Sequence, residues 1–108
     1  MMNDTQLQII KEQLKHLTSI DCFYKEKLKG FDVEGIKSEE DFQKLPFTWK
    51  GDLREAYPLG LMAVDESEIV RIHSSSGTTG TPVIIPYTQK DVDDWATMFA
   101  RCYEMAGI

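Results

Sequence analysis

The chain has 108 residues, of which 42% are hydrophobic, and it carries 18 acidic against 12 basic side chains, for a net charge of −6. Its length allows one domain at most. The negative charge argues against nucleic acid or an anionic membrane as a partner, because both are bound by basic patches. No apolar run approaches the roughly 18–20 residues of a membrane span, and the first residues lack the pattern of a secretory signal. We therefore expect a cytoplasmic protein in which Cys22 and Cys102 are buried, reduced thiols.

Residues 1–64 are predicted to form a helical region. Apolar side chains recur at spacings of three, four and three residues, which predicts an amphipathic helix over residues 5–17. Thr5 and Gln8 have the spacing of a capping box at its start. The residues on its apolar face are Leu7, Ile10, Leu14 and Leu17. His16 has no partner suggested by the sequence and is expected to be solvated.

Shorter helices are predicted after this one. The first covers residues 21–28 and stops at Gly30, a residue that takes the left-handed conformation without strain. Residues 31–37 read as a connector. Ser38 then has the position of an N-cap for a helix that extends to Lys44.

A helical turn over residues 48–54 and an irregular connection over residues 57–64 complete the helical region. The turn contains Trp49, which we expect to pack with its N–H at the rim of the core. Pro58 and Gly60 interrupt the apolar run that follows, so no regular element is predicted there.

Residues 65–108 are predicted to form a strand, a loop, a second strand and a helix. The strands are apolar, β-branched runs over residues 69–73 and 83–85, and Pro86 either ends the second run or lies at a sheet edge. In the first strand, alternation places Arg71 and His73 on one face. They point toward the loop, or alternatively Arg71 pairs with an acid such as Asp65 or Glu66.

The last predicted element is a long amphipathic helix over residues 89–106. Thr88 and Asp91 have the spacing of its capping box, and Gly107 has the position of its stop. The apolar side chains that keep a helical period, and that are expected in a core, are Val92, Trp95, Phe99, Cys102 and Met105 or Ala106.

The loop between the two strands contains only serine, threonine, glycine and a final proline. Gly77 and Gly80 can adopt positive φ without a Cβ clash, so several backbone amides and hydroxyls can converge on one anion. Each hydrogen bond to such a charged group contributes roughly 1.5–3 kcal/mol. An ordinary turn has the same composition, and the loop has no Walker A sequence, so composition alone leaves both interpretations open.

The order of these residues is more informative than their composition. Residues 75–82, Ser-Ser-Gly-Thr-Thr-Gly-Thr-Pro, resemble the phosphate-binding loop of the adenylate-forming acyl-CoA synthetase superfamily. The flanking residues narrow the resemblance to phenylacetate-CoA ligases, from about Phe23 onward. They include Leu45-Pro46-Phe47-Thr48, Tyr57-Pro58-Leu59-Gly60-Leu61, Val70-Arg71-Ile72-His73, Tyr87-Thr88, Asp91, Trp95, Ala100-Arg101-Cys102 and Ala106-Gly107.

The resemblance implies an enzyme that uses ATP, Mg²⁺ and CoA to activate an aryl acid, with the CoA site outside these residues. It implies no catalytic residue and no metal ligand within this chain. The residues that it assigns to the ATP phosphates are Ser75, Ser76, Gly77, Thr78, Thr79, Gly80 and Thr81. Thr81 departs from the family, which usually has lysine before the proline, so a mobile positive charge is replaced by a neutral hydroxyl.

The predicted fold class is α/β for the whole protein and α+β for this part of it. A hairpin and one long amphipathic helix do not close a layered core, so we expect the N-terminal portion of a longer ligase domain, inactive when isolated. Two other classes stay open, a non-catalytic nucleotide- or phosphate-binding module and an interaction domain that forms a homo-oligomer. The acid itself is open too, with phenylacetate as the family default.

Overall fold

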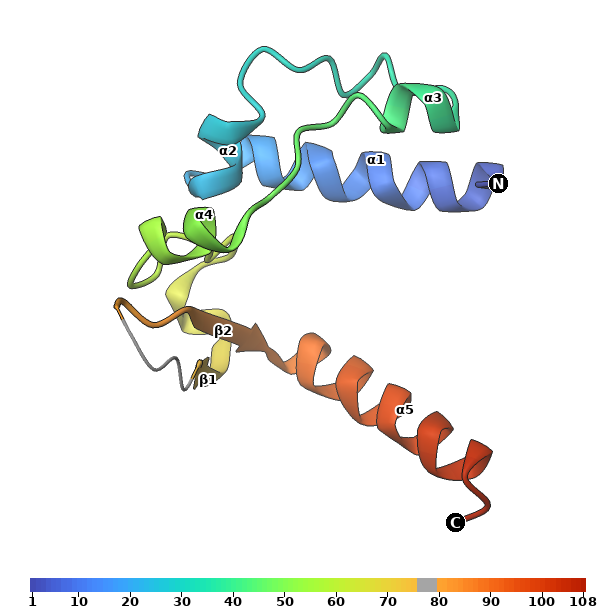
Figure 1. The fold of residues 1–108 in the computed structure, drawn as a ribbon, viewed down its shortest axis with the longest axis vertical. Coiled ribbons are helices and arrows are strands. Elements are labelled where there is room, and N and C mark those ends of the chain that lie inside the picture. Colours follow the sequence, from blue (N-terminus) through green and yellow to red (C-terminus); the bar gives the residue numbers. More distant parts are fainter. Residues whose placement is uncertain (76–79) are drawn as a thin grey trace.

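Helices make up the first half of the chain, and a β-hairpin followed by a long helix makes up the second (Figure 1). The computed structural model describes residues 1–75 and 80–108. Its elements are α1 (Asp4–Ser19), α2 (Phe23–Lys27), α3 (Glu39–Phe42), α4 (Lys50–Glu55), the 3₁₀ turn η1 (Glu66–Glu68), β1 (Ile69–Ser74), β2 (Ile84–Thr88) and α5 (Gln89–Met105). The mixture agrees with the α+β class predicted for this part.

The α1 helix begins earlier than the sequence pattern predicts. The side chain of Asn3 accepts a hydrogen bond from the Gln6 amide at 2.8 Å, and the Gln6 side chain accepts one from the Asn3 amide at 3.0 Å. The predicted box of Thr5 and Gln8 is therefore wrong, because Asn3 lies two residues upstream and satisfies the first free amides. His16 is exposed, as predicted, although the sequence did not suggest the contact of its Nε2 atom with the carbonyl oxygen of Ala63.

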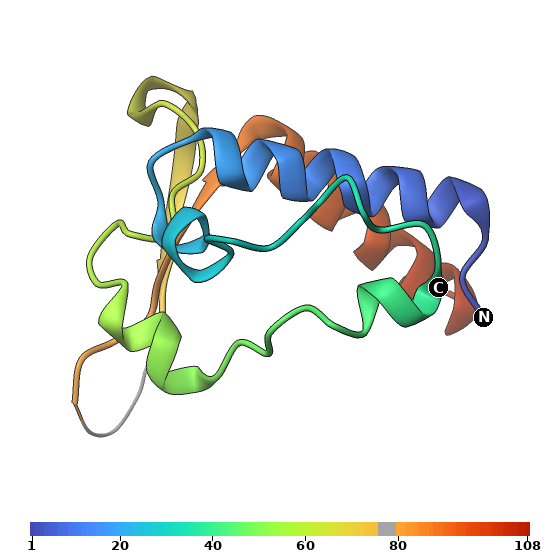
Figure 2. The ribbon, with the colours of Figure 1, turned by 90° about the horizontal axis from the view of Figure 1, so that it is seen from above.

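The core lies between α1 and the segment that returns over it, residues 28–45, as Figures 1 and 2 show from two sides. The predicted connector is part of this core, because Val33 is buried and Ile36 is only 1% exposed. The other buried members are Leu7, Leu14 and Leu28. The connector is thus held by packing against α1, although it has no regular secondary structure of its own.

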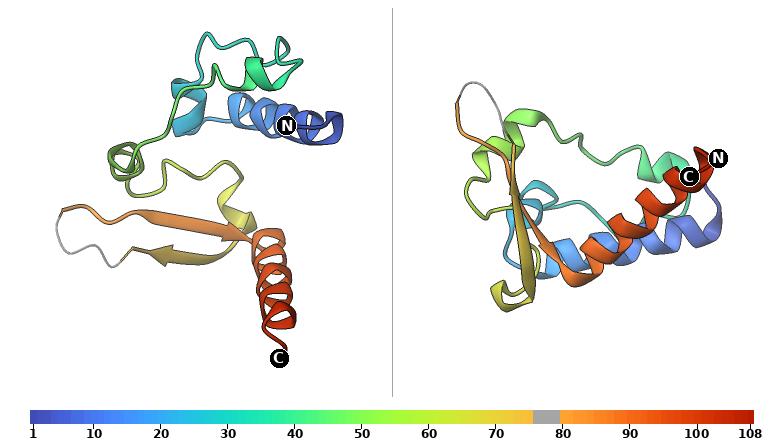
Figure 3. Two further views of the ribbon diagram at one scale, coloured as in Figure 1. Left: turned by 45° about the vertical axis from the view of Figure 1, so that its right-hand side comes forward. Right: turned by 90° about the horizontal axis from the view of Figure 1, so that it is seen from below.

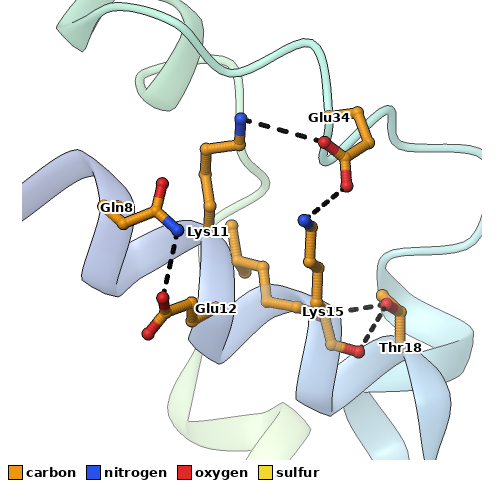
Figure 4. Close-up of polar contacts among 7 residues, drawn as sticks. Gln8, Lys11, Glu12, Lys15, Thr18 and Glu34 are labelled. Carbon is orange, nitrogen blue, oxygen red and sulfur yellow. Dashed lines mark hydrogen bonds and ion pairs between the residues drawn. The ribbon is translucent and has the colours of Figure 1, made fainter.

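An ion-pair cluster reinforces the contact between α1 and this segment. Glu34 lies 2.6 Å from the Nζ atom of Lys15 and 3.9 Å from that of Lys11, and both lysines reach toward it from α1 (Figure 4). The hydrogen bond from Lys15 lowers the pKa of Glu34 below its ordinary value. Both Lys15 and Glu34 are largely exposed, so the pair orients the segment more than it stabilises it.

The three short helices are shorter than predicted, but two of their boundaries are confirmed. Gly30 has φ +83°, the left-handed conformation expected of a helix stop. The Ser38 side chain accepts a hydrogen bond from the Asp41 amide at 3.3 Å, as expected of an N-cap. The prediction for Trp49 is wrong, because its side chain is 68% exposed and contacts only the edge of Phe47 among aromatic rings.

Asp52 joins α4 to α2 and gives this contact a pH dependence. Its Oδ2 atom accepts a hydrogen bond from the backbone amide of Trp49 at 2.8 Å and lies 3.1 Å from Lys27 Nζ. The pKa of Asp52 is held below its ordinary value of 3.8, mainly by the hydrogen bond from the Trp49 amide and next by the one from Lys27. A depressed carboxyl pKa contributes stability that is present above the unfolded-state value and is lost as the pH falls through the folded-state pKa.

Asp52→Asn should therefore lower the free energy of unfolding at neutral pH, and the deficit should shrink as the pH falls below 3.8. Urea unfolding followed by circular dichroism across this range measures the difference. Glu55→Gln, which neutralises an exposed carboxyl of the same helix, is the control. A deficit that stays constant at every pH would contradict the assignment.

The two strands pair antiparallel, with His73 opposite Ile85 and Ser74 opposite Ile84, and a register shift near the start of β1. The second strand is predicted too early and too short, because Pro86 lies inside it opposite Ile72. A proline is tolerated here because each strand of a two-stranded sheet is an edge, so one side of its backbone needs no ladder hydrogen bond.

The α5 helix follows β2 directly and matches its prediction. The Thr88 side chain accepts from the Asp91 amide at 3.2 Å, the Asp91 carboxylate accepts from the Thr88 amide at 2.9 Å, and Gly107 has φ +81°. The expected core on its apolar face is not present among the described residues, since no residue of α5 is buried and Cys102 is exposed. Cys22 is buried as predicted.

The uncovered helix gives the molecule an open shape. In Figure 3, left, α5 stands off the end of the hairpin away from α1. The radius of gyration is 16.1 Å, against about 13 Å for a compact domain of this length. No helix in the described part of the chain is both long and apolar enough to cross a membrane.

Candidate functional site

The predicted phosphate loop extends from the turn end of the hairpin, beyond the last strand pair. The Ser75 amide donates to the Val83 carbonyl at 2.9 Å, and the Val83 amide donates to Ser75 Oγ at 2.9 Å. Val83 is buried. These two hydrogen bonds close the base of the loop, so its ends are held at a fixed separation by the hairpin.

The two hydrogen bonds to Val83 determine which groups of Ser75 can still bind an anion. Its amide is already bonded to Val83, and one acceptor site of its hydroxyl is filled by the Val83 amide. The hydroxyl proton is still available to donate. Ser75 can therefore contribute one O–H donor to a phosphate while anchoring the loop.

The far side of the loop is shaped by Gly80, which has φ +81°. A Cβ atom there would meet nothing within 4 Å, so only the backbone conformation favours glycine at this position. Thr81, which follows, is exposed. The other predicted phosphate ligands, Ser76, Gly77, Thr78 and Thr79, lie outside the described residues, so the convergence of their amides stays a prediction.

Two polar side chains of β1, those of His73 and Arg71, lie in different surroundings. The ring of His73 lies 4.9 Å from that of Tyr87 and 5.2 Å from that of Trp95, so it belongs to an aromatic contact. Arg71 is exposed, and among the described residues no ion pair joins it to Asp65 or Glu66. The Asp65 carboxylate instead accepts from the amide and hydroxyl of Ser67 at 2.9 and 2.6 Å.

Metal sites and grooves in the part of the chain that the structure describes are the other places where a ligand could bind. Within residues 1–75 and 80–108 there is no group of three or more His, Cys, Asp or Glu that could hold a metal ion. A groove of about 480 Å³ lies between α1 and the opposite end of the hairpin, near Ile69 and Thr88. None of Ser75, Gly80 and Thr81 lines this groove.

Sequence reasoning missed two features of this region. Tyr87 brings β2 into contact with both His73 and Trp95, and it was expected only as part of a flanking motif. Ser75 was expected as a phosphate ligand and is also the anchor of the loop. Its position directly after β1 and eight residues before Val83 is the signal for that closure.

Ser75→Ala should release this anchor. The substitution leaves the Val83 amide without its acceptor, and an unsatisfied buried donor costs about 1–3 kcal/mol. Hydrogen exchange of the Val83 amide should accelerate about 5- to 100-fold, measured by NMR. Ser74→Ala is the control, because the exposed Ser74 hydroxyl donates to the Ser75 carbonyl at 3.3 Å and does not bond to Val83. Equal acceleration in the two variants would contradict the anchoring role.

Comparisons with known proteins agree with the resemblance inferred from the loop and its flanks. No protein-family model matches the chain. It is 43% identical over 107 residues to the phenylacetate-coenzyme A ligase of Aromatoleum evansii and 42% identical over 107 residues to that of Escherichia coli strain K12. Identity to the Pseudomonas putida ligase is 41% over 104 residues. Each alignment covers 94% of this chain and 24% of the relative, so the chain spans about a quarter of the length of the relatives it matches. The resemblance to phenylacetate-CoA ligases is thus confirmed over almost the whole of this chain, and the chain is related in sequence to about a quarter of such a protein.

Proposed function

We propose that this chain supplies the ATP-phosphate loop of an ATP-dependent, AMP-forming ligase that joins an aryl acid to CoA. Its relatives are named phenylacetate-coenzyme A ligases, which makes phenylacetate the first acid to test. The observation that carries the proposal is the hairpin loop itself. Ser75 anchors one end, Gly80 turns the other in the left-handed conformation, and the sequence between them resembles the phosphate loop of adenylate-forming enzymes.

The reaction takes two steps. The acid carboxylate attacks the α-phosphorus of ATP and pyrophosphate leaves, which gives an acyl-adenylate. The thiol of CoA then attacks the acyl carbon, AMP leaves and the thioester forms. Residues 75–81 hold the β- and γ-phosphates, so they position the leaving group and stabilise the charge that develops on it.

These residues act as donors and transfer no proton. Serine and threonine hydroxyls and backbone amides are neutral, so they stabilise negative charge without changing their own protonation state. Magnesium ion, bound to the phosphate oxygens, would neutralise part of their charge. Thr81, where the family usually has lysine, adds a hydroxyl and no positive charge, so ATP is expected to bind more weakly here than to a ligase with that lysine.

The test uses a chimera in which this chain replaces the matched residues of the Escherichia coli relative. We expect ATP–pyrophosphate exchange that depends on phenylacetate, and formation of phenylacetyl-CoA when CoA is added. The isolated 108-residue chain should show neither reaction. A soluble chimera without acid-dependent exchange would contradict the proposal. ATP binding by the isolated chain in calorimetry, together with an inactive chimera, would favour a nucleotide-binding module.

A further inference from the structure

His73 contacts two aromatic rings close to the point where the loop begins. Its ring centroid lies 4.9 Å from that of Tyr87 on β2 and 5.2 Å from that of Trp95 on α5. The rings of Tyr87 and Trp95 also lie 5.7 Å apart, so each of the three rings contacts the other two. His73 and Tyr87 are half-buried, and Trp95 is 36% exposed. These three residues connect β1, β2 and α5 at one place.

The strand register relates this contact to the loop. His73 is paired with Ile85, and Tyr87 lies two residues further along β2, so the rings of His73 and Tyr87 form a diagonal cross-strand pair. Two residues after His73, the Ser75 amide donates to the Val83 carbonyl and closes the base of the loop. Hydrogen-bonded pairs alternate along an antiparallel ladder, so His73 belongs to the hydrogen-bonded pair next to this closure.

The hairpin needs support at the end that carries the loop. A two-stranded sheet is marginally stable in water, and the ends of such an element open most readily. The α5 helix begins at Gln89, at the other end of the hairpin, as Figure 3 shows on the left. Trp95 nevertheless contacts His73, so it connects α5 to the last part of β1. This contact therefore opposes separation of the strand ends between which the loop is held.

We infer that His73 is a positioning residue for the ATP-phosphate loop. Its ring, held by Tyr87 and Trp95, fixes the end of β1. It thereby fixes the position of Ser75, whose hydroxyl anchors the loop and can donate to a phosphate. The role belongs to the ring and not to a proton, because both contacts are between rings, with interplanar angles of 65° and 66°. The consequence for ATP rests on the proposed function, whereas the consequence for the hairpin does not.

Hydrogen exchange of the Val83 amide, measured by NMR on the 108-residue chain, tests the effect on the hairpin. His73→Ala should accelerate this exchange about 3- to 30-fold, because it removes both ring contacts. His73→Phe keeps a ring and should restore the native rate within about twofold, whereas His73→Asn should behave like His73→Ala. Ile72→Ala is the matched control, because Ile72 is the adjacent residue of β1 and is 57% exposed. Its truncation should change the rate by about twofold or less.

Kinetics of ATP–pyrophosphate exchange in the chimera test the effect on ATP. His73→Ala should raise KM for ATP about 10-fold or more and leave KM for phenylacetate within about twofold, because the displaced residues bind the phosphates and not the acid. A role in folding alone would reduce the amount of active protein, which lowers the maximal rate and leaves both KM values unchanged. His73→Phe should restore KM for ATP. Equal increases in the two KM values would overturn the inference.

The remaining outcomes also decide the question. Val83 exchange that is unchanged in His73→Ala, or that is as fast in His73→Phe, would overturn the inference. If the His73 variants do not fold, Trp95→Ala removes the same contact from the side of α5 and should accelerate Val83 exchange, and an unchanged rate would again overturn the inference. Faster Val83 exchange in His73→Ala, with a native chimera that lacks ATP–pyrophosphate exchange, would uphold the positioning of Ser75 while contradicting the proposed function. An active chimera whose KM for ATP is unaffected by His73→Ala would uphold the proposed function and overturn the inference.

Discussion

Replacing Thr78 and Thr79 together by alanine is expected to slow acid-dependent ATP–pyrophosphate exchange in the chimera by about 100-fold or more. Each threonine hydroxyl that donates to a charged phosphate oxygen contributes roughly 1.5–3 kcal/mol, and about 1.4 kcal/mol corresponds to a factor of ten in rate. The backbone amides of the loop stay in place, so residual activity should persist. The initial rate of labelled pyrophosphate incorporation into ATP, at saturating phenylacetate, measures the effect.

The control for this prediction removes two threonine hydroxyls from elsewhere in the chain. Thr5 is exposed near the start of α1, and the Thr97 hydroxyl donates to the Asp93 carbonyl within α5 at 3.0 Å. Thr5→Ala with Thr97→Ala should leave the exchange rate within about twofold, since surface substitutions of this kind change stability by about 0.5 kcal/mol or less. If the Thr78 and Thr79 variant kept both its exchange rate and its ATP affinity, the phosphate-binding role of these residues would be wrong.

The features that the sequence predicted correctly are those fixed by neighbouring residues. The α5 helix begins at the box of Thr88 and Asp91 and is followed by the left-handed Gly107, because capping and stop signals act over three or four residues. For the same reason, the left-handed Gly30 follows the end of α2, and Ser38 caps the start of α3. The hairpin was also predictable, since two β-branched runs flank a loop of turn-forming residues.

The features that could not be predicted depend on contacts between distant residues. Asn3 starts α1 by forming a capping box with Gln6 in place of the predicted box, and choosing between the two positions requires knowing where the helix packs. Cys102 and Trp95 have the periodicity of a core stripe, and their exposure reflects the absence of a covering element among the described residues. At the candidate site, Gly80 was predicted from its own conformational freedom. The anchoring by Ser75 requires its contact with Val83 across the loop.

The largest effect on stability is expected from Ile36→Ala. Ile36 is 1% exposed and is the most completely buried large side chain among the described residues. It packs with Leu7 and Leu14 of α1 and with Leu28 and Val33 of the returning segment. Truncation of a fully buried isoleucine costs about 2–5 kcal/mol, partly for lost burial and partly for the cavity left behind. Because the segment around Ile36 has no regular secondary structure, packing is what holds it in place.

The urea midpoint for the loss of helical circular dichroism at 222 nm should therefore fall sharply. Ile9→Ala is the matched control. Ile9 belongs to the same α1 helix but is 59% exposed, so its truncation should change the free energy of unfolding by about 0.5 kcal/mol or less. Both substitutions replace isoleucine by alanine, so a difference between them in the free energy of unfolding reflects burial and not residue type. Equal destabilisation by both substitutions would show that the contact between α1 and residues 28–45 is not the core of this half of the chain. A stable Ile36→Ala variant with intact hydrogen-exchange protection in α1 would show that the returning segment is held by other contacts, such as those of Glu34 with Lys11 and Lys15.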